Sequence, residues 1–292
     1  MHGWLVVNHF VRAPKFSEIY QLLIDAFRDR GVELAIRTNA ELLSILDGGT
    51  GRDVDFILFW DKDILLARHL ENLGYRLFNS ATAIETCDDK GLCAVRLEGK
   101  GIRMPKTATS PLTYPSLGYP SLDFLDRIVD ELGFPMVVKE NRGSFGKQVY
   151  LVKSRTELDD LVRQLVPGRM IFQEYISASF GRDLRIQTVG DEIIASVMRI
   201  GKEGDFRANV TNGGHMISYE PSQAARSLAL NVARELKLDF AGIDILLGES
   251  DEPILCEVNS NAHFKNLMDA TGINIACHLA DHVKRVMTGD DH

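Results

Sequence analysis

One stretch, residues 240–259, constrains the fold and the chemistry of this chain more than any other. Two apolar, strand-like runs within it flank a polar turn, which is typical of a β-hairpin. Glu257 and Asn259 are two residues apart, so both side chains lie on the same face of their strand. Antiparallel pairing of the two runs brings Asp244 onto that face. Two carboxylates and an amide oxygen are ligands that Mg²⁺ accepts, so the hairpin predicts a metal site.

The same hairpin has a second interpretation, in which its acidic residues are solvated positions of an amphipathic sheet. Asp244 argues against it, because this residue interrupts the apolar run 243–247, where a solvated charge is poorly placed. We therefore expect Asp244, Glu257 and Asn259 to be metal ligands.

Composition excludes several classes of function. A chain of 292 residues with 45% hydrophobic content can bury more than one core. Its net charge of −8 argues against a general nucleic-acid binder. No apolar run approaches the roughly 20 residues of a membrane span, and the N-terminus resembles a strand more than a signal peptide. The cysteines lack CxxC spacing, so we expect reduced thiols in a cytoplasmic protein without membrane partners.

The apolar pattern divides the chain into three units. Residues 1–85 alternate strand and helix patterns, which implies a parallel α/β layer. Within this unit, Ser17 is expected to cap the first long helix, and residues 40–46 are expected to form a short helix. Residues 86–166 and 167–292 follow as a central and a C-terminal unit that mix strands with helices. The predicted fold class is α/β of the mixed α+β kind.

A glycine-rich segment of the central unit has the features of a phosphate-binding flap. Lys139 ends an apolar strand, and the small-residue segment Gly143, Ser144, Phe145 and Gly146 follows. Glycines permit tight turns and let backbone N–H groups approach phosphate oxygens. The ammonium of Lys139 is well placed for a nucleotide phosphate, although a lysine at a strand end is also often solvated.

Arginine side chains in the C-terminal unit are candidates for stabilising a reacting group. Arg185, Arg199 and Arg207 supply bidentate donors, and Asn209 follows them. Beside a phosphate centre, such groups stabilise charge on a transferring phosphoryl group or on a tetrahedral intermediate. Taken singly, each arginine is more often part of a surface ion pair.

A further segment is a candidate for binding the nucleobase of a nucleotide. In Gln173, Glu174, Tyr175 and Ile176, the backbone can contact an adenine edge while apolar side chains cover the ring. An ordinary strand is the alternative. Asp183 can accept a hydrogen bond from a ribose hydroxyl, or it is a turn residue.

The loop after the first strand is a candidate substrate site. Open α/β sheets bind ligands at the carboxyl ends of their strands. Arg12 and Lys15 lie in this loop and can hold a carboxylate. A solvated basic loop is an equally good interpretation.

In their order along the chain, these motifs resemble the ATP-grasp superfamily. The spacing is similar to that of the RimK-like amino-acid ligases, including the LysX-type enzymes of the lysine pathway that uses an amino-group carrier. The resemblance covers roughly residues 85–285 and implies an N-terminal α/β domain before a two-subdomain ATP-grasp fold. The matching segments are residues 89–90, 134–139, 143–146, 173–176, 181–185, 206–209, 213–214, 242–244 and 257–259.

The resemblance also implies a role for each motif. Lys90 and Lys139 would contact the phosphates of ATP, and the flap would close over them. Segment 173–176 would lie at the adenine, and Asp183 at the ribose. Mg²⁺, with Mn²⁺ as an alternative, would be held by Asp244, Glu257 and Asn259. The phosphoryl and acyl groups would be contacted by Arg185, Arg199, Arg207 and Asn209.

The activity implied by the resemblance is that of an ADP-forming carboxylate–amine ligase. Such an enzyme makes an acyl phosphate and attaches an amino acid to a small molecule, a peptide or a protein terminus. An ATP-grasp kinase and a nucleotide-binding regulatory protein without turnover are the alternatives, and the intact metal-ligand set argues against the regulatory protein. Relatives are often homo-oligomers.

The chain departs from the family pattern after Asn259. Glutamate-adding relatives usually carry Ser-Pro-Gly there, whereas this chain continues to a Phe-Lys-Asn sequence closer to the LysX type. The resemblance therefore leaves the added amino acid open. Asn261, His263 and Lys265 are candidate substrate contacts, and a loop that leads into a helix is the alternative.

Overall fold

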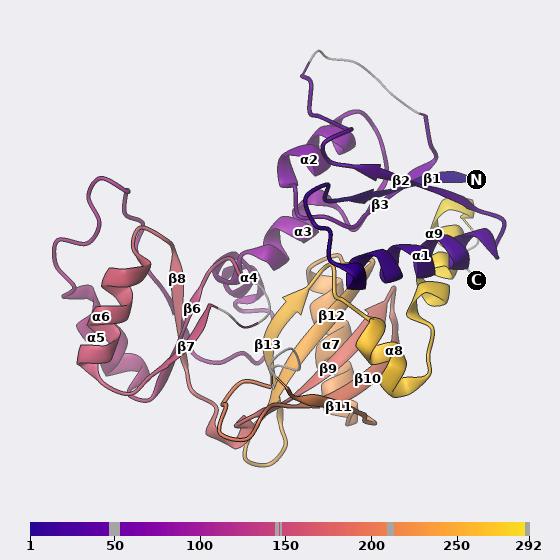
Figure 1. Ribbon diagram of the computed structural model, residues 1–292. Helices are drawn as coiled ribbons and strands as arrows, with labels where there is room; N and C mark the ends of the chain where they lie inside the picture. The colour runs from indigo at the N-terminus through magenta and orange to yellow at the C-terminus, as the bar shows by residue number, and fades with distance from the viewer. Residues whose placement is uncertain (47–52, 144–145, 147, 209–212, 290–292) are drawn as a thin grey trace.

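The computed structural model describes residues 1–46, 53–143, 146, 148–208 and 213–289 (Figure 1). Within these residues the longer strands form three sheets, and the N-terminal sheet is parallel with the strand order β2–β1–β3–β4. The elements of this part are β1 (His2–Val7), α1 (Pro14–Arg28), β2 (Glu33–Thr38), β3 (Phe56–Phe59), α2 (Ile64–Asn72), β4 (Leu77–Phe78) and α3 (Ala81–Asp88).

The N-terminal sheet is buried on both faces. Leu5 and Leu58 point into a core that α1 and α9 share, while the alternate residues Val6 and Ile57 pack with α2. Successive side chains of a strand point to opposite faces, so continuous apolar runs suit a parallel sheet with helices on both sides. The predicted parallel α/β layer is confirmed.

Two local predictions in this unit were wrong. Helix α1 begins at Pro14, after Ala13, and Ser17 lies inside the helix. Proline suits the first turn because its fixed φ is helical and the N–H it lacks has no partner there. The expected helix at 40–46 is a turn followed by irregular chain. The turn forms because Thr38 and Glu41 exchange backbone and side-chain hydrogen bonds at the end of β2.

The central sheet is antiparallel, with the order β5–β8–β6–β7. Its strands β6 and β7 form the hairpin that carries the glycine segment, as predicted. Strand β8 lies beyond residue 166, where the sequence analysis places a boundary, and the domain limits stay a prediction. The elements are α4 (Lys90–Leu97), β5 (Thr107–Thr109), α5 (Phe124–Leu132), β6 (Met136–Glu140), β7 (Val149–Val152), α6 (Arg155–Leu165) and β8 (Met170–Glu174).

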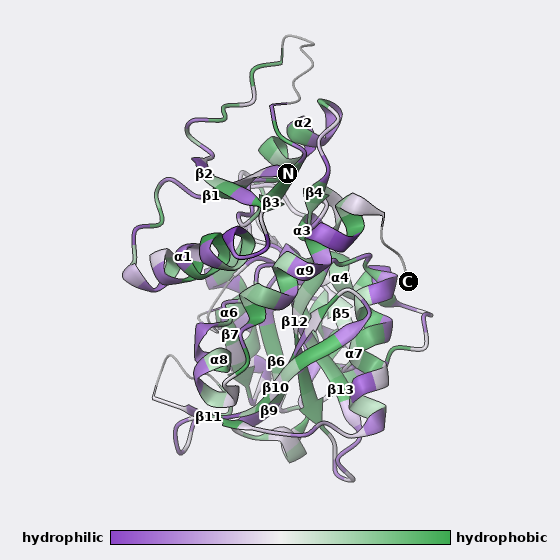
Figure 2. Cartoon of the chain, turned by 90° about the vertical axis from the view of Figure 1, so that its right-hand side faces the viewer, coloured by the Kyte–Doolittle hydropathy of each residue, from purple (hydrophilic) through white to green (hydrophobic). Residues whose placement is uncertain are grey.

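The C-terminal sheet is antiparallel, with the order β11–β10–β9–β12–β13. Figure 2 shows hydrophobic residues gathered on its strands, beneath helices of mixed colour. The predicted hairpin is β12–β13, with Asp244 opposite Glu257. The elements are a 3₁₀ turn (Ser177–Ser179), β9 (Arg182–Val189), β10 (Glu192–Ile200), β11 (His215–Ser218), α7 (Gln223–Glu235), β12 (Phe240–Leu247), β13 (Pro253–Asn259), α8 (Lys265–Thr271) and α9 (Ile275–Thr288).

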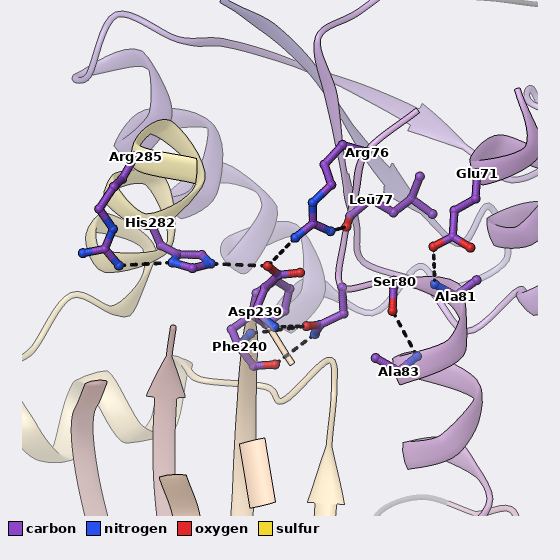
Figure 3. A network of polar contacts seen from close by, with 11 residues as sticks. Glu71, Arg76, Leu77, Ser80, Ala81, Ala83, Asp239, Phe240, His282 and Arg285 are labelled. Atoms are coloured by element: carbon purple, nitrogen blue, oxygen red, sulfur yellow. Dashed lines mark hydrogen bonds and ion pairs between the residues drawn. The ribbon is translucent and has the colours of Figure 1, made fainter. Parts of the chain in front are cut away.

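A buried polar junction joins the N-terminal sheet to the C-terminal sheet. Figure 3 shows Asp239, just before β12, between Arg76 and His282, at 2.6 and 3.4 Å. The completely buried amide of Asn79 donates to the carbonyl oxygens of Phe240 (2.9 Å) and Ser260 (3.0 Å). The end of β4 is thereby hydrogen-bonded both to the start of β12 and to the loop that follows β13.

Over the described ranges, no helix combines the length and the apolar composition that crossing a bilayer requires.

Candidate functional site

A cavity of about 560 Å³ lies between the three sheets. Its walls come from the loops that follow β1 and β3, from the β6–β7 flap and β8, and from one face of the C-terminal sheet. The structure thus brings most of the predicted site residues to one space. These are Lys15, Lys90, Lys139, Gly143, Gly146, Gln173, Glu174, Tyr175, Ile176, Asp183, Arg185, Arg199, Arg207, Asp244, Glu257, Asn259, Asn261, His263 and Lys265.

Four predicted residues are not among those lining the cavity. Arg12 is exposed and does not line the cavity, so the structure gives no support to its expected contact with substrate. Ser144, Phe145 and Asn209 lie outside the described residues, and their roles stay predictions.

Two ammonium groups lie beside the flap. The Nζ of Lys90, at the start of α4, is 3.2 Å from the carbonyl oxygen of Gly143 and 3.3 Å from Oε1 of Glu257. Lys139, at the inner end of β6, is buried, with its Nζ 3.7 Å from Sγ of Cys256. Lys139 is thus buried with a thiol as its partner, while Lys90 is partly buried and paired with Glu257. Both ammonium groups can bind phosphate oxygens.

Arg207, which follows β10 of the C-terminal sheet, is hydrogen-bonded to the flap at Gly146. Its Nη1 donates to the carbonyl oxygen of Gly146 at 3.0 Å, while Asp205 holds the other side of the guanidinium at 3.0 Å. Gly146 has a φ of +68°, which side chains rarely tolerate, so glycine is required at this bend. The carbonyl oxygens of Gly143 and Gly146 are therefore both held by cationic side chains from outside the flap.

Two aspartates and two arginines form a buried charge network on the cavity face of the C-terminal sheet. Asp183 and Arg185 lie on β9, opposite Arg199 of β10 and Asp244 of β12. Arg185 binds both oxygens of Asp244, at 2.5 and 2.7 Å. Arg199 binds both oxygens of Asp183, at 2.6 and 2.5 Å, and reaches Asp244 at 2.8 Å.

This network fixes the protonation state of Asp244. Burial alone would raise the pKa of its carboxyl, but the guanidinium groups of Arg185 and Arg199 lower the pKa below the usual value. Within the described part of the chain, the Nη1 groups of both arginines keep their hydrogens available. The network can thus hold an anionic group in the cavity without losing its own ion pairs.

The carboxylate and amide oxygens expected to hold a metal lie on one sheet face. Asp244 is paired in register with Glu257, and Gly242 with Asn259. Across the described ranges, no three His, Cys, Asp or Glu side chains gather into a metal-binding group. A cation here would be bound by hard oxygen donors only, with the rest of its shell from water or phosphate, which fits Mg²⁺. The metal assignment stays a prediction.

The segment expected at the adenine also lines the cavity. The ring of Tyr175 lies 6.4 Å from that of Phe206, and Gln173 donates to Thr107 at 2.9 Å. Burial raises the pKa of the Tyr175 hydroxyl, so it stays neutral. Asp183 has both oxygens bound by Arg199, and its contact with a ribose stays a prediction.

Sequence reasoning selected the loop that follows β1 but not Asn8 within it, and it missed Asp61 and Tyr20. Asn8 follows β1 and Asp61 follows β3, and both line the cavity together with Tyr20. Their position at the carboxyl ends of parallel strands was the signal that could have found them. Burial raises the pKa of the Asp61 carboxyl, although hydrogen bonds from Lys62 and Asn8 oppose the shift.

His263, from the loop after β13, also lines the cavity. Its Nε2 lies 3.3 Å from the carbonyl oxygen of Lys15, and its ring packs edge-on against Phe16. Because a carbonyl oxygen accepts, Nε2 carries the hydrogen. Burial lowers the pKa of His263, so the ring is neutral and Nδ1 is an acceptor.

The fold and this site define a class of protein with known members. The family model of the RimK-like ATP-grasp domain matches residues 87–283. The chain belongs to the RimK-like ATP-grasp family, which confirms the resemblance drawn from its motifs. It is 33% identical over 233 residues to N-acetylaspartylglutamate synthase A of Homo sapiens. It is 31% identical over 220 residues to the probable alpha-L-glutamate ligase of Legionella pneumophila (strain Corby).

The two alignments cover different shares of the relatives. They take in 78% and 75% of this chain, but 57% of the human synthase and 70% of the Legionella ligase. The chain therefore spans little more than half the length of the human relative.

Solved structures share the fold over the whole chain. The RimK domain protein ATP-grasp from Sphaerobacter thermophilus DSM 20745 has a TM-score of 0.74 at 18% identity, covering 97% of this chain and 99% of its own. The ATP-grasp ligase PsnB, solved with a phosphomimetic variant of its minimal precursor, Mg and ADP, has a TM-score of 0.71 at 16% identity, covering 98% of each chain. The predicted fold is confirmed.

Proposed function

We propose that the protein is an ATP-dependent ligase that joins a carboxylate to an amine through an acyl phosphate. One observation carries the proposal. A single cavity holds the ammonium groups of Lys90 and Lys139 beside a glycine flap, the arginine–aspartate network, and further polar groups from the N-terminal sheet. It therefore has phosphate-binding groups and room for further substrates in one enclosed space.

The chemistry follows from leaving groups. A carboxylate is a poor acyl donor, because its leaving group would be oxide. Transfer of the γ-phosphoryl group of ATP to the carboxylate oxygen releases ADP and gives an acyl phosphate. The lone pair of an amine then attacks the acyl carbon, orthophosphate leaves, and the amine nitrogen loses its proton. The protein contributes positioning and charge rather than a covalent nucleophile.

Each group in the cavity has a task in this sequence. Lys90 and Lys139 bind the phosphates, and Arg185 and Arg199 use their free Nη1 groups to stabilise charge on the phosphoryl and acyl oxygens. The flap excludes water, since an acyl phosphate exposed to water hydrolyses. The adenine is assigned to segment 173–176.

Magnesium is the metal that suits the oxygen donors of Asp244, Glu257 and Asn259, with Mn²⁺ as an alternative. Bound there, it would neutralise charge on the phosphates of ATP. PsnB, which shares the fold, was solved with Mg and ADP, which supports the assignment.

The amine is proposed to be an amino acid. The relatives are named as a synthase of N-acetylaspartylglutamate and a probable glutamate ligase, so L-glutamate is the first amine to test. We also propose a cytosolic location, which is supported by the free thiols of the four cysteines, all within the described residues.

Phosphate release from Mg-ATP, measured across pools of amino acids and carboxylic acids with mass spectrometry of the products, tests the proposal. A ligase releases phosphate only with a matching acid and amine, and its product is lighter than their sum by one water. A phosphorylated product that forms without an amine would indicate a kinase. ATP binding without ADP release in any pool would indicate a regulatory protein.

A further inference from the structure

Asp61 is a buried carboxylate in the cavity wall, and its charge is not paired. The residue is 9% exposed and lines the cavity. Its oxygens accept from the backbone N–H of Lys62 at 2.7 Å and from the amide of Asn8 at 3.2 and 3.3 Å. The ammonium of Lys62 is 2.5 Å from Asp88 instead. Among the described residues, no cationic side chain lies within 4.0 Å of the Asp61 oxygens.

A second acceptor without a donor belongs to Asn261, a cavity-lining residue that is hydrogen-bonded to the backbone of Asp61. Oδ1 of Asn261 is buried and has no hydrogen-bond partner in the described part of the chain. The orientation of this amide is fixed, because Nδ2 of Asn261 donates to the backbone oxygen of Asp61 at 2.7 Å. Flipping the amide would place two oxygens against each other. One hydrogen bond through the Asp61 backbone therefore links the two residues. Over the described ranges, Asp61 carries a carboxylate without a cationic partner, and Asn261 carries a side-chain oxygen without a donor.

Without a bound ligand, these two acceptors lower the stability of the folded protein. A buried carboxylate without a counter-charge and a buried amide oxygen without a donor both oppose folding. Burial also raises the pKa of Asp61, because the charged carboxylate has lost the water that would stabilise it. A cost of this kind is offset when a ligand supplies a positive charge together with N–H groups.

We propose that Asp61 and the side-chain oxygen of Asn261 bind the ammonium group of the amino-acid substrate. An ammonium carries three donors and one positive charge, which match the two acceptors. The inference rests on the proposed function, since it assigns one substrate of that ligase to the N-terminal end of the cavity.

Substitution of Asp61 by asparagine tests the inference. Asp61→Asn keeps the shape and removes the charge, and Asn261→Ala removes the second acceptor. The matched control is Asp55→Asn, which removes one charge from an exposed residue just before the other end of β3. Two quantities are measured on the full chain with Mg-ATP: the KM of each substrate, and the change in Tm caused by each of the common amino acids and by its deaminated counterpart.

The expected result separates a binding role from a structural one. Asp61→Asn raises the KM of the amino acid about 10- to 100-fold, the loss expected for a hydrogen-bonded charge pair, and leaves the KM of ATP unchanged. The Tm of the free variant stays equal or rises, because an unpaired buried charge is gone. Asn261→Ala gives a smaller rise of the same KM, and Asp55→Asn matches the wild type.

Other outcomes decide against the inference. It is overturned when the amino-acid KM is unchanged in Asp61→Asn, when the KM of ATP rises equally, or when no amino acid stabilises the wild-type protein more than its deaminated counterpart does. Failure of the ligase itself gives a different signature. Amino acids would then still stabilise the wild type in an Asp61-dependent way, but no amide product would form.

Discussion

Arg199 binds both oxygens of Asp183 and one oxygen of Asp244, and these groups are almost completely shielded from water. Replacing it by methionine removes both hydrogen bonds to the Asp183 carboxylate and leaves that group with the more distant charge of Arg185. We expect Arg199→Met to lower the free energy of unfolding by about 3–5 kcal/mol, the usual cost of breaking a buried ion pair. Urea denaturation measures this loss.

An exposed ion pair provides the control for Arg199. Arg234 contacts Asp191 at 2.9 Å, with side chains 57% and 75% exposed. Arg234→Met should cost less than about 1 kcal/mol, because water screens such pairs. Equal losses in the two variants would show that the buried network does not stabilise the C-terminal sheet.

His263 should make the stability of the protein depend on pH. Burial lowers its pKa from the ordinary value of 6.5, so between the two values the unfolded chain binds a proton that the folded chain refuses. The stability contributed by this residue is therefore present above pH 6.5 and is lost as the pH falls below it. His263→Gln should flatten the decline in unfolding free energy between about pH 7.5 and pH 5.5.

At the scale of elements, the flap between β6 and β7 depends on a distant strand connection. Arg207 follows β10 in the chain and holds the carbonyl oxygen of Gly146 at 3.0 Å. Under the proposed ligase function, Arg207→Met should raise the KM of ATP about tenfold and increase the share of ATP that is hydrolysed without amide formation. The ratio of phosphate released to amide formed reports this uncoupling.

The flap prediction has a control in the same part of the fold. Arg163 is an exposed residue of α6, so Arg163→Met removes an equal charge without touching the flap. Uncoupling of similar size in both variants, or tight coupling in Arg207→Met, would contradict the anchoring role.

At the scale of the whole molecule, Asn79 joins two sheets that are far apart in sequence. Its side-chain N–H groups donate to the backbone oxygens of Phe240 and Ser260, and its side-chain oxygen accepts from the N–H of Asp239 at 2.6 Å. Figure 3 draws the surrounding residues. Asn79→Ala leaves several buried backbone groups unsatisfied, and each costs about 1–3 kcal/mol. We expect a loss of at least about 3 kcal/mol in the free energy of unfolding, measured in urea.

A comparison with another asparagine isolates the junction. Asn231 lies on the exposed face of α7, so Asn231→Ala should change the free energy of unfolding by less than about 0.5 kcal/mol. Similar stability of the Asn79→Ala and wild-type proteins would mean that the two sheets dock through their apolar cores alone.

Local spacing in the sequence determined several features of this protein. The β12–β13 hairpin and the shared face of Asp244, Glu257 and Asn259 were predictable, because alternation along a strand is a property of neighbouring residues. The parallel N-terminal layer and the flap hairpin followed from the same periodicity and from glycine placement. Short elements such as α3, α8, β5 and β11 were missed, since a few residues carry too weak a pattern.

Contacts between distant residues were decided only by the tertiary structure. The sequence offered Asp183 and Asp244 as free acceptors, whereas sheet register places each of them opposite an arginine. Asn261 meets Asp61 across 200 positions of chain, and no local pattern records that meeting. Periodicity acts over a few residues, while the pairing of buried charges depends on which strands become neighbours. The sequence alone therefore determined which groups share a strand face, and the fold decided which groups line the cavity and which of them remain unpaired for a ligand.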